Sequence, residues 1–342
     1  MMKNSFMELV MCKPDDWHVH FRDWPMLKNF VPYTAEQFAR ALVMPNTKLP
    51  VSNGGGVTAY ERTILKGVPS RLNFKPLMTF KITPGTTAED VISAQAAGAI
   101  AGKLYPDGVT TNSEGGVRDF ESIFEIFAIM QDVGLVLCLH GEHPDAECMD
   151  REKRFIDEVL YKIVESFPKL RVVLEHISTE AGVTAVSEMS PLVAGTITAH
   201  HLELTHTDVI GGLLKPHLFC KPIAKWKKDR DKLLEAAVSG NPKFFFGSDS
   251  APHYQSDKEC AEGCAGIFSA PVALPVLAGV FERLGCLNNL QAFVSQFGAE
   301  FYRLPLNQEQ ITLVKKEWHV PDTICSVVPY HAGETLAWSL KM

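Results

Sequence analysis

Short apolar runs alternate with longer amphipathic segments along the chain. Eight of these runs have the length and the residue types of buried β-strands. The predicted strands are Trp17–His20, Ala41–Met44, Leu77–Ile82, Ala101–Tyr105, Leu135–His140, Arg171–His176, Ala194–Ala199 and Lys243–Gly247. The segments between them have helical character, and strands that alternate with helices predict parallel βαβ units.

The clearest predicted helix spans Val117–Asp132. From Phe120 onward its apolar side chains recur at helical spacing, which places them on one face and the charged residues elsewhere. Such a stripe is typical of a helix that packs on a sheet. Asp150–Phe167 and Trp226–Ser239 show a similar pattern.

Eight is the number of strands that closes a (β/α)8 barrel, the α/β fold known as the TIM barrel. Such barrels take about 250 residues, whereas this chain has 342. We therefore predict a single barrel domain over residues 1–342 with terminal extensions, which include a helical segment after Ser269 and the tail beyond Leu304. A doubly wound open sheet is the alternative, although no G-x-G-x-x-G follows the first strand and Gly54-Gly55-Gly56 lacks that spacing.

The composition is that of a soluble globular protein, with 46% hydrophobic and 21% charged residues. Lys and Arg number 33 against 40 Asp and Glu, which gives a net charge of −7, and there is no basic tract. We therefore expect no nucleic-acid partner. An anionic substrate would have to be attracted by local positive charge.

The sequence gives no sign of export or membrane insertion. The apolar stretch within Met1–Lys13 is short and interrupted by Glu8, and the run Ala270–Phe281 is too short to span a bilayer. The eight cysteines lack the spacing of a disulfide framework. We expect a cytoplasmic protein with free thiols that does not bind a membrane.

Polar residues interrupt the apolar runs at their C-terminal ends. In a barrel all of these ends meet at one rim, where enzymes of this fold keep their active sites. The residues concerned are His18, His20, Asn46, Lys103, His140, His176 and Asp249. We expect them to share one site although they lie far apart along the chain.

His18 and His20 are two residues apart in a strand, so both imidazoles face the barrel mouth. Alone, such a pair would be a coincidence. Two further strands end in histidine, at His140 and His176, and another is followed by the carboxylate of Asp249. Four imidazoles and an oxygen ligand suit Zn²⁺ or a similar divalent ion.

Lys103 follows Ala101-Gly102 in an apolar strand. A lone ammonium is costly to bury, so something must neutralise it. One possibility is a salt bridge to a nearby carboxylate or an exposed strand end. The other is a reaction of the amine with CO₂, which gives a carbamate whose two oxygens bridge two metal ions.

Three more polar residues complete the predicted site. Arg22 lies two residues beyond His20, where its guanidinium suits a substrate carboxylate. Asn46 follows the next strand, and His253 lies on a loop beyond Asp249. Taken singly, each residue also has a simpler interpretation, which is a surface ion pair for Arg22, a turn or cap for Asn46 and a solvated histidine for His253.

Two longer motifs contain many of these residues. Asp16–Asp23 has the sequence DWHVHFRD, and Gly247–His253 has the sequence GSDSAPH and is followed by Lys258. Both closely resemble the signature motifs of dihydroorotases of the monofunctional bacterial type, in the amidohydrolase superfamily. Shorter stretches match in order and spacing, namely Met44-Pro45-Asn46, Lys103-Leu104-Tyr105-Pro106, His140-Gly141-Glu142 and Glu175-His176. The resemblance extends from about Lys13 to Ala332–Thr335.

The resemblance implies a reversible ring closure, in which N-carbamoyl-L-aspartate gives L-dihydroorotate and water as the third step of pyrimidine (UMP) synthesis. It implies two Zn²⁺ per subunit and a homodimer. The implied ligands are His18, His20 and Asp249 for one ion and His140 and His176 for the other, with a carboxylated Lys103 bridging them. Asp249 would also be the catalytic group that takes a proton from water and returns it to the leaving nitrogen.

The resemblance also implies a set of substrate contacts, in which Arg22, Asn46 and His253 grip the carboxylate. The implied contacts are His20, Arg22, Asn46, His140, Lys221, His253 and Ala265. The family usually has leucine where this chain has Lys221, and a backbone contact there is compatible with that change. The loop Asp107–Gly116 resembles a lid, whose Thr110 and Thr111 would donate hydrogen bonds to the substrate.

Two other functions remain open at this point. A cyclic amidase of the hydantoinase or dihydropyrimidinase kind would share the metal centre, but its substrate has no carboxylate for Arg22, Asn46 and His253 to bind. A non-catalytic dihydroorotase-like scaffold would have lost its ligands, whereas here every ligand position is filled. Zinc content would distinguish such a scaffold from an enzyme.

Other histidines and cysteines are predicted to lie outside the site. His200 and His201 follow an apolar run, and neighbouring strand residues point to opposite faces, so at most one would line the mouth. Cys260 and Cys264 lack a second cysteine pair, and we interpret them as part of a turn rather than as a zinc knuckle.

Overall fold

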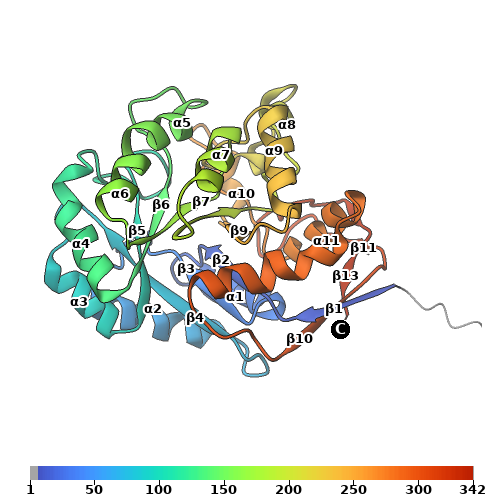
Figure 1. Ribbon diagram of the computed structural model, residues 1–342. Coiled ribbons are helices and arrows are strands. Elements are labelled where there is room, and N and C mark those ends of the chain that lie inside the picture. Colours follow the sequence, from blue (N-terminus) through green and yellow to red (C-terminus); the bar gives the residue numbers. More distant parts are fainter. Residues whose placement is uncertain (1–6, 342) are drawn as a thin grey trace, which may run out of the picture.

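The computed structural model describes residues 7–341, and its centre is a barrel of eight parallel strands (Figure 1). Each strand pairs with the next one along the chain. The strands are β2 (Asp15–Val19), β3 (Arg40–Val43), β4 (Lys75–Ile82), β5 (Ala99–Leu104), β6 (Val136–His140), β7 (Arg171–Glu175), β8 (Val193–Ile197) and β9 (Phe244–Phe246). All eight predicted strands are present, with ends that differ by no more than two residues.

The barrel closes between its first and last strands. The backbone N–H of Asp249 donates to the carbonyl of His18 at 2.8 Å, and that of His20 donates to Ser250 at 3.0 Å. The predicted (β/α)8 barrel is therefore confirmed, and the open-sheet alternative is wrong.

Helices surround the barrel, as Figure 1 shows for α2, α3 and α4 on one side and α7 and α9 on another. The α-helices are α1 (Met26–Gln37), α2 (Gly54–Gly67), α3 (Ala88–Ala96), α4 (Phe124–Val133), α5 (Arg151–Phe155), α6 (Tyr161–Ser166), α7 (Glu180–Glu188), α8 (His206–Ile210), α9 (Lys227–Val238), α10 (Gln255–Lys258), α11 (Ala273–Arg283) and α12 (Phe297–Phe301). Short 3₁₀ or π segments are η1 (Glu121–Ile123), η2 (Ile156–Leu160), η3 (Pro216–Leu218), η4 (Leu287–Asn289) and η5 (Ala292–Gln296).

The predicted start of one helix is wrong. We expected a helix from Val117, but the 3₁₀ turn η1 precedes α4 and begins only at Glu121. The backbone of Val117 is instead bonded to the strand-end loop, because its N–H donates to Tyr105 at 3.0 Å and its carbonyl accepts from Asp107 at 3.2 Å. By contrast, α9 coincides with the predicted helix at Trp226–Ser239 to within one residue.

Alternating strand residues form two apolar layers. In β6 the side chains of Leu137 and Leu139 pack against the helices, whereas Cys138 faces the barrel interior. Trp17 is also buried in the interior, where its ring stacks on Tyr302 with 4.3 Å between centroids. This packed layer fills the barrel, so a ligand site can form only at its ends.

The two ends of the described chain pair with each other. Strand β1 (Glu8–Cys12) is antiparallel to β10 (Gln310–Val314), which also pairs with β13 (Ser339–Leu340), and the three lie together in Figure 1. A second small sheet joins β11 (Trp318–His319) to β12 (Thr335–Leu336). The expected helix after Ser269 is α11. Within residues 7–341 no helix is long and apolar enough to cross a membrane.

Candidate metal centre and active site

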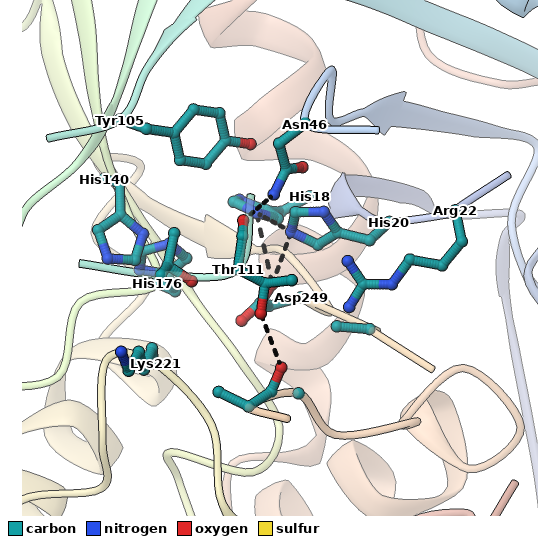
Figure 2. Close-up of a pocket in the computed structure, with 14 residues that line it drawn as sticks. His18, His20, Arg22, Asn46, Tyr105, Thr111, His140, His176, Lys221 and Asp249 are labelled. Carbon is teal, nitrogen blue, oxygen red and sulfur yellow. Dashed lines mark hydrogen bonds and ion pairs between the residues drawn. The ribbon is translucent and has the colours of Figure 1, made fainter. Parts of the chain in front are cut away.

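A pocket lies at the C-terminal ends of the barrel strands (Figure 2). It collects most of the residues predicted for the site. Its lining comprises His18, His20, Arg22, Asn46, Tyr105, Thr110, Thr111, His140, His176, Lys221, Asp249, Ala251, Ala265 and Gly266. Lys103 and His253 are the two predicted residues that do not form the wall itself.

Three ligand atoms converge on one side of the pocket. The Nε2 atom of His20 lies 3.2 Å from Oδ1 of Asp249, and Nε2 of His18 lies 3.5 Å from the same oxygen. The two Nε2 atoms are 3.3 Å apart. Figure 2 shows the three side chains pointing toward one another. Two imidazoles and a carboxylate at such separations suit a divalent metal ion.

A buried carboxylate orients each of two pocket histidines. Oε2 of Glu175 lies 2.9 Å from Nδ1 of His18, and the same oxygen accepts a hydrogen bond from Thr196 Oγ1 at 2.7 Å. On the other side, Oε2 of Glu142 lies 2.9 Å from Nε2 of His140. A carboxylate on one ring nitrogen fixes the tautomer and leaves the other nitrogen for a metal.

His140 and His176 form the opposite side of the pocket. Their ring centroids are 4.6 Å apart, in an edge-to-face arrangement. Within the described part of the chain, the buried Nδ1 atom of His176 has no hydrogen-bond partner. A buried polar atom without a partner is costly, so this nitrogen is suited to bind a metal ion.

Lys103 lies in β5 beneath the pocket, and its side chain is 0% exposed. Its Nζ finds no hydrogen-bond partner among residues 7–341 and lies 5.3 Å from the ring centroid of Tyr105. Burial lowers the pKa of this amine, although the charges of Glu175 and Asp249 oppose that shift. The predicted salt-bridge alternative has no support in the described residues, where no ion pair of Lys103 occurs.

Three site residues have positive φ angles without being glycine. They are Arg22 at 62°, His176 at 40° and Asp249 at 43°. This conformation costs free energy in a residue with a Cβ atom, about 1–3 kcal/mol each. All three follow barrel strands, where the strained backbone turns their side chains into one pocket.

The protonation states suit metal binding. Burial lowers the pKa of His20 to about 4 and also lowers the pKa values of His140 and His176, so these rings are neutral near pH 7. Burial alone would raise the pKa of Asp249, but its hydrogen bond with His20 and the neighbouring imidazoles outweigh burial and hold that pKa well below its usual range. Neutral imidazole and ionised carboxylate are the forms that bind a metal.

Arg22 lies on the side of the pocket away from His140 and His176 in Figure 2. Its Nε donates to the carbonyl of Pro252 at 3.1 Å, and Nη2 donates to Nε2 of His253 at 2.7 Å. Burial, together with the charge of Arg22, lowers the pKa of His253 to about 2. His253 therefore stands beside Arg22 as a neutral ring and helps to fix the guanidinium.

The loop Asp107–Gly116 is folded over the pocket. Asn46 Nδ2 donates to the carbonyl of Thr111 at 3.0 Å, and Asn112 Nδ2 donates back to the carbonyl of Asn46 at 2.9 Å. The hydroxyl of Thr111 donates to the carbonyl of Ala265 at 3.4 Å. Thr110 and Thr111 thus line the pocket, and their role in a lid stays a prediction.

Lys258 has a structural role that the sequence did not reveal. Its ammonium donates to the carbonyls of Phe219, Cys264 and Gly266 at 3.2, 3.0 and 2.5 Å. These three carbonyls belong to the loops that carry Lys221 and Ala265 into the pocket. The sequence showed a lysine shortly after the second motif, but nothing in the local sequence indicated what it binds.

The prediction that His200 and His201 lie outside the site is confirmed, but the reason given for it is wrong. Strand β8 ends at Ile197, so the two histidines lie in a turn and the rule of opposite faces does not apply. Their ring centroids are only 4.7 Å apart. Neither residue lines the pocket.

Comparison with known proteins identifies close relatives over the whole length. No protein-family model matches the chain. A dihydroorotase from Pseudoalteromonas atlantica is 47% identical over 341 residues, which cover 98% of this chain and 99% of the relative. A dihydroorotase from Pseudomonas aeruginosa is 47% identical over 339 residues, or 97% of each chain.

Solved structures agree with this result. The crystal structure of a dihydroorotase from Campylobacter jejuni superposes with a TM-score of 0.92 at 40% identity, covering 100% of this chain and 99% of the other. A dihydroorotase from Saccharomyces cerevisiae, in complex with 5-fluoroorotic acid, gives 0.91 at 37% identity and 98% coverage of both chains.

More distant structures share the fold alone. An L-hydantoinase from Arthrobacter aurescens gives a TM-score of 0.81 at 18% identity, covering 97% of this chain and 83% of the other. Relatives with 47% identity over nearly all of both chains are a far more specific match. The chain therefore belongs to the dihydroorotase family, a family of cyclic amide hydrolases within the amidohydrolase superfamily.

Proposed function

We propose that this protein interconverts N-carbamoyl-L-aspartate and L-dihydroorotate, with release or uptake of water, at a centre of two Zn²⁺ ions. The observation that carries the proposal is the convergence of His18, His20 and Asp249 above a buried Lys103 that has no partner in the described chain. Family membership supports the cyclic amide as the substrate class.

The ligand types in the pocket fit zinc. His18, His20 and Asp249 would hold one ion, and His140 and His176 would hold the other. Glu175 and Glu142 support this assignment because each lies on the ring nitrogen of a ligand histidine. Two bound ions would lower the pKa of a bound water and polarise the amide carbonyl.

Lys103 would carry the carboxylate between the two ions. Burial lowers the pKa of its amine, which increases the fraction in the neutral form that reacts with CO₂. The reaction forms an N–C bond and releases one proton. The product would replace a buried amine, which finds no partner within residues 7–341, by a carbamate with two ligand oxygens.

Arg22, Asn46 and His253 would bind the substrate carboxylate. The guanidinium of Arg22 is held by Pro252 and His253, so it is already oriented before the substrate arrives. Backbone groups of Ala265 and Lys221 would contact the rest of the substrate, beside His20 and His140. The positive charge of Arg22 would attract an anion to a chain whose net charge is −7.

Asp249 would move the proton of the reaction. Its pKa lies below the usual range, so it is ionised and able to accept a proton from the attacking water. It would then return that proton to the nitrogen that leaves as the ring opens. In the direction of ring closure, the same carboxylate would take the proton from the attacking nitrogen.

The residues of the pocket argue against the other two functions. A hydantoinase-type substrate offers no carboxylate to Arg22, and the likeness to L-hydantoinase concerns the fold alone. A scaffold has no need of the buried, hydrogen-bonded ligand histidines described above.

We further propose that the chain forms one domain and acts in the cytoplasm on this small-molecule substrate. We also propose that it forms a homodimer, which measurement of its mass in solution would test.

An assay on protein of measured zinc content tests the proposal. Both N-carbamoyl-L-aspartate and L-dihydroorotate should be converted, at a rate that rises with zinc bound, and hydantoin and dihydrouracil should react far more slowly. Arg22→Met should raise KM by at least tenfold, whereas Arg71→Met, an exposed arginine paired with Glu36, should change nothing. Fast turnover of hydantoin, or an unchanged KM in Arg22→Met, would contradict the proposal.

A further inference from the structure

A second cluster of metal-binding side chains lies behind the pocket wall. His200 and His201 lie in the turn after β8, and Cys220 follows η3. The three residues are 0%, 2% and 1% exposed. A nitrogen of each imidazole and the Cys220 sulfur all lie within 4.8 Å of one another. The cluster shares no residue with the candidate active site.

The imidazole of His200 is the most informative member. Neither of its ring nitrogens has a hydrogen-bond partner in the part of the chain that the structure describes. A buried polar group left unsatisfied costs about 1–3 kcal/mol. Because one of these nitrogens faces His201 and Cys220, a ligand bound among the three side chains would satisfy it.

The other donors are arranged around the same point. Nε2 of His201 lies 3.9 Å from Cys220 Sγ. The carbonyl oxygen of Pro222 accepts hydrogen bonds from that nitrogen at 3.0 Å and from the Cys220 thiol at 3.2 Å, and a bound metal ion would replace both. Two imidazoles, a thiol and a carbonyl therefore supply up to four ligand atoms. Nδ1 of His201 is held by Thr198 Oγ1 at 2.8 Å, which is the kind of contact that orients a metal-bound ring.

We propose that His200, His201 and Cys220 form a further metal site, which binds one Zn²⁺ in addition to the ions of the active site. Imidazole and thiolate ligands both suit zinc, which is four-coordinate in most structural sites. On binding, the Cys220 thiol releases its proton to solvent and the sulfur binds as thiolate. The ion joins the turn after β8 to Pro222, whose neighbour Lys221 lines the pocket.

The sulfur atom makes the site measurable apart from the active site. No predicted ligand of the active site is a cysteine, so a metal–thiolate bond reports only on cysteine-containing sites. The full-length protein is stripped of metal and titrated with Co²⁺. We expect a thiolate-to-cobalt charge-transfer band in the near ultraviolet, and one more equivalent of bound metal than in Cys220→Ser.

Matched variants identify the cysteine that gives rise to the charge-transfer band. It should vanish in Cys220→Ser and weaken strongly in His200→Phe, which keeps a ring but removes both nitrogens. It should persist in Cys138→Ser, a buried cysteine that contacts Tyr302, and in the double variant Cys260→Ser/Cys264→Ser. A band that survives in Cys220→Ser, or that disappears with Cys260 and Cys264, would overturn the proposal.

A measurement on the unaltered protein covers the case in which Cys220→Ser does not fold. X-ray absorption at the zinc edge of the zinc-loaded chain should contain a zinc–sulfur component beside the nitrogen and oxygen neighbours. Absence of sulfur around zinc would refute the site. This result is independent of turnover, so it stands or fails separately from the proposed dihydroorotase activity.

Discussion

Replacing Lys103 by methionine should stabilise the metal-free protein while abolishing its activity. Methionine is unbranched, close to lysine in length and well tolerated in buried positions. In the folded chain the Lys103 amine is fully buried and has no hydrogen-bond partner within residues 7–341. Such a group costs about 1–3 kcal/mol, so the unfolding free energy of the metal-free variant should exceed that of the wild type by about that amount.

The sign follows from the pKa of the amine. Burial lowers the pKa of Lys103 below its value in the unfolded chain, so the ammonium form favours unfolding at neutral pH. The neighbouring Glu175 keeps its contacts with His18 and Thr196 when Lys103 is removed. In the presence of zinc the wild type should be more stable than Lys103→Met, because a ligand at about 1,000 times its Kd stabilises the folded state by about 4 kcal/mol.

Lys81 provides the control, since it is Lys103's neighbour across the β4–β5 pair. It is also buried, but its Nζ donates to the carbonyl of Asn112 at 2.9 Å. Lys81→Met should therefore destabilise the metal-free protein. The unfolding free energies of the wild type and both variants are measured by urea unfolding of the metal-free proteins in CO₂-free buffer, with tryptophan fluorescence as the signal. A metal-free Lys103→Met variant less stable than the wild type would refute the reasoning.

Further predictions concern the proton carrier, the lid and the pocket wall. Asp249→Asn should keep the fold but lower kcat by about 10²–10⁴-fold, because an amide cannot accept the proton; a normal rate and pH profile would show that another group does so. Thr110→Val/Thr111→Val should lower kcat/KM by about 30-fold at unchanged zinc content, which corresponds to two hydrogen bonds of about 1 kcal/mol each; unaltered kinetic constants would make the loop a mere connection. Lys258→Met should lower the unfolding free energy by about 3 kcal/mol, because three carbonyls lose their donor, and should raise KM; denaturant melts and kinetics that match those of Lys227→Met, a lysine whose side chain is 76% exposed, would show that the contacts are dispensable.

The strands and the rim residues could be predicted because both depend on local sequence. A buried parallel strand needs a short apolar run, and a polar residue at its end, such as His140 or Asp249, has only the rim to occupy. The start of α4 could not be predicted in this way. Val117 belongs to an apolar stripe, but its backbone is bonded to the loop that follows β5.

Contacts between distant segments could not be predicted from local sequence patterns. Strand β1 pairs with β10 about 300 residues later, and neither sequence specifies its partner. The donors to Glu175 and the acceptors of Lys258 likewise come from other parts of the chain. The prediction for His200 and His201 applied a strand rule to residues outside any strand, because β8 ends three residues before His200, at Ile197.

Anomalous diffraction from crystals of the zinc-loaded protein tests the central claim most directly. Data collected on both sides of the zinc edge should show two peaks in the pocket, one beside His18, His20 and Asp249 and one beside His140 and His176. Electron density should extend beyond Nζ of Lys103 as a planar group that reaches both peaks. A pocket with a single peak, or a Lys103 side chain that ends at its nitrogen in zinc-loaded crystals, would contradict the account.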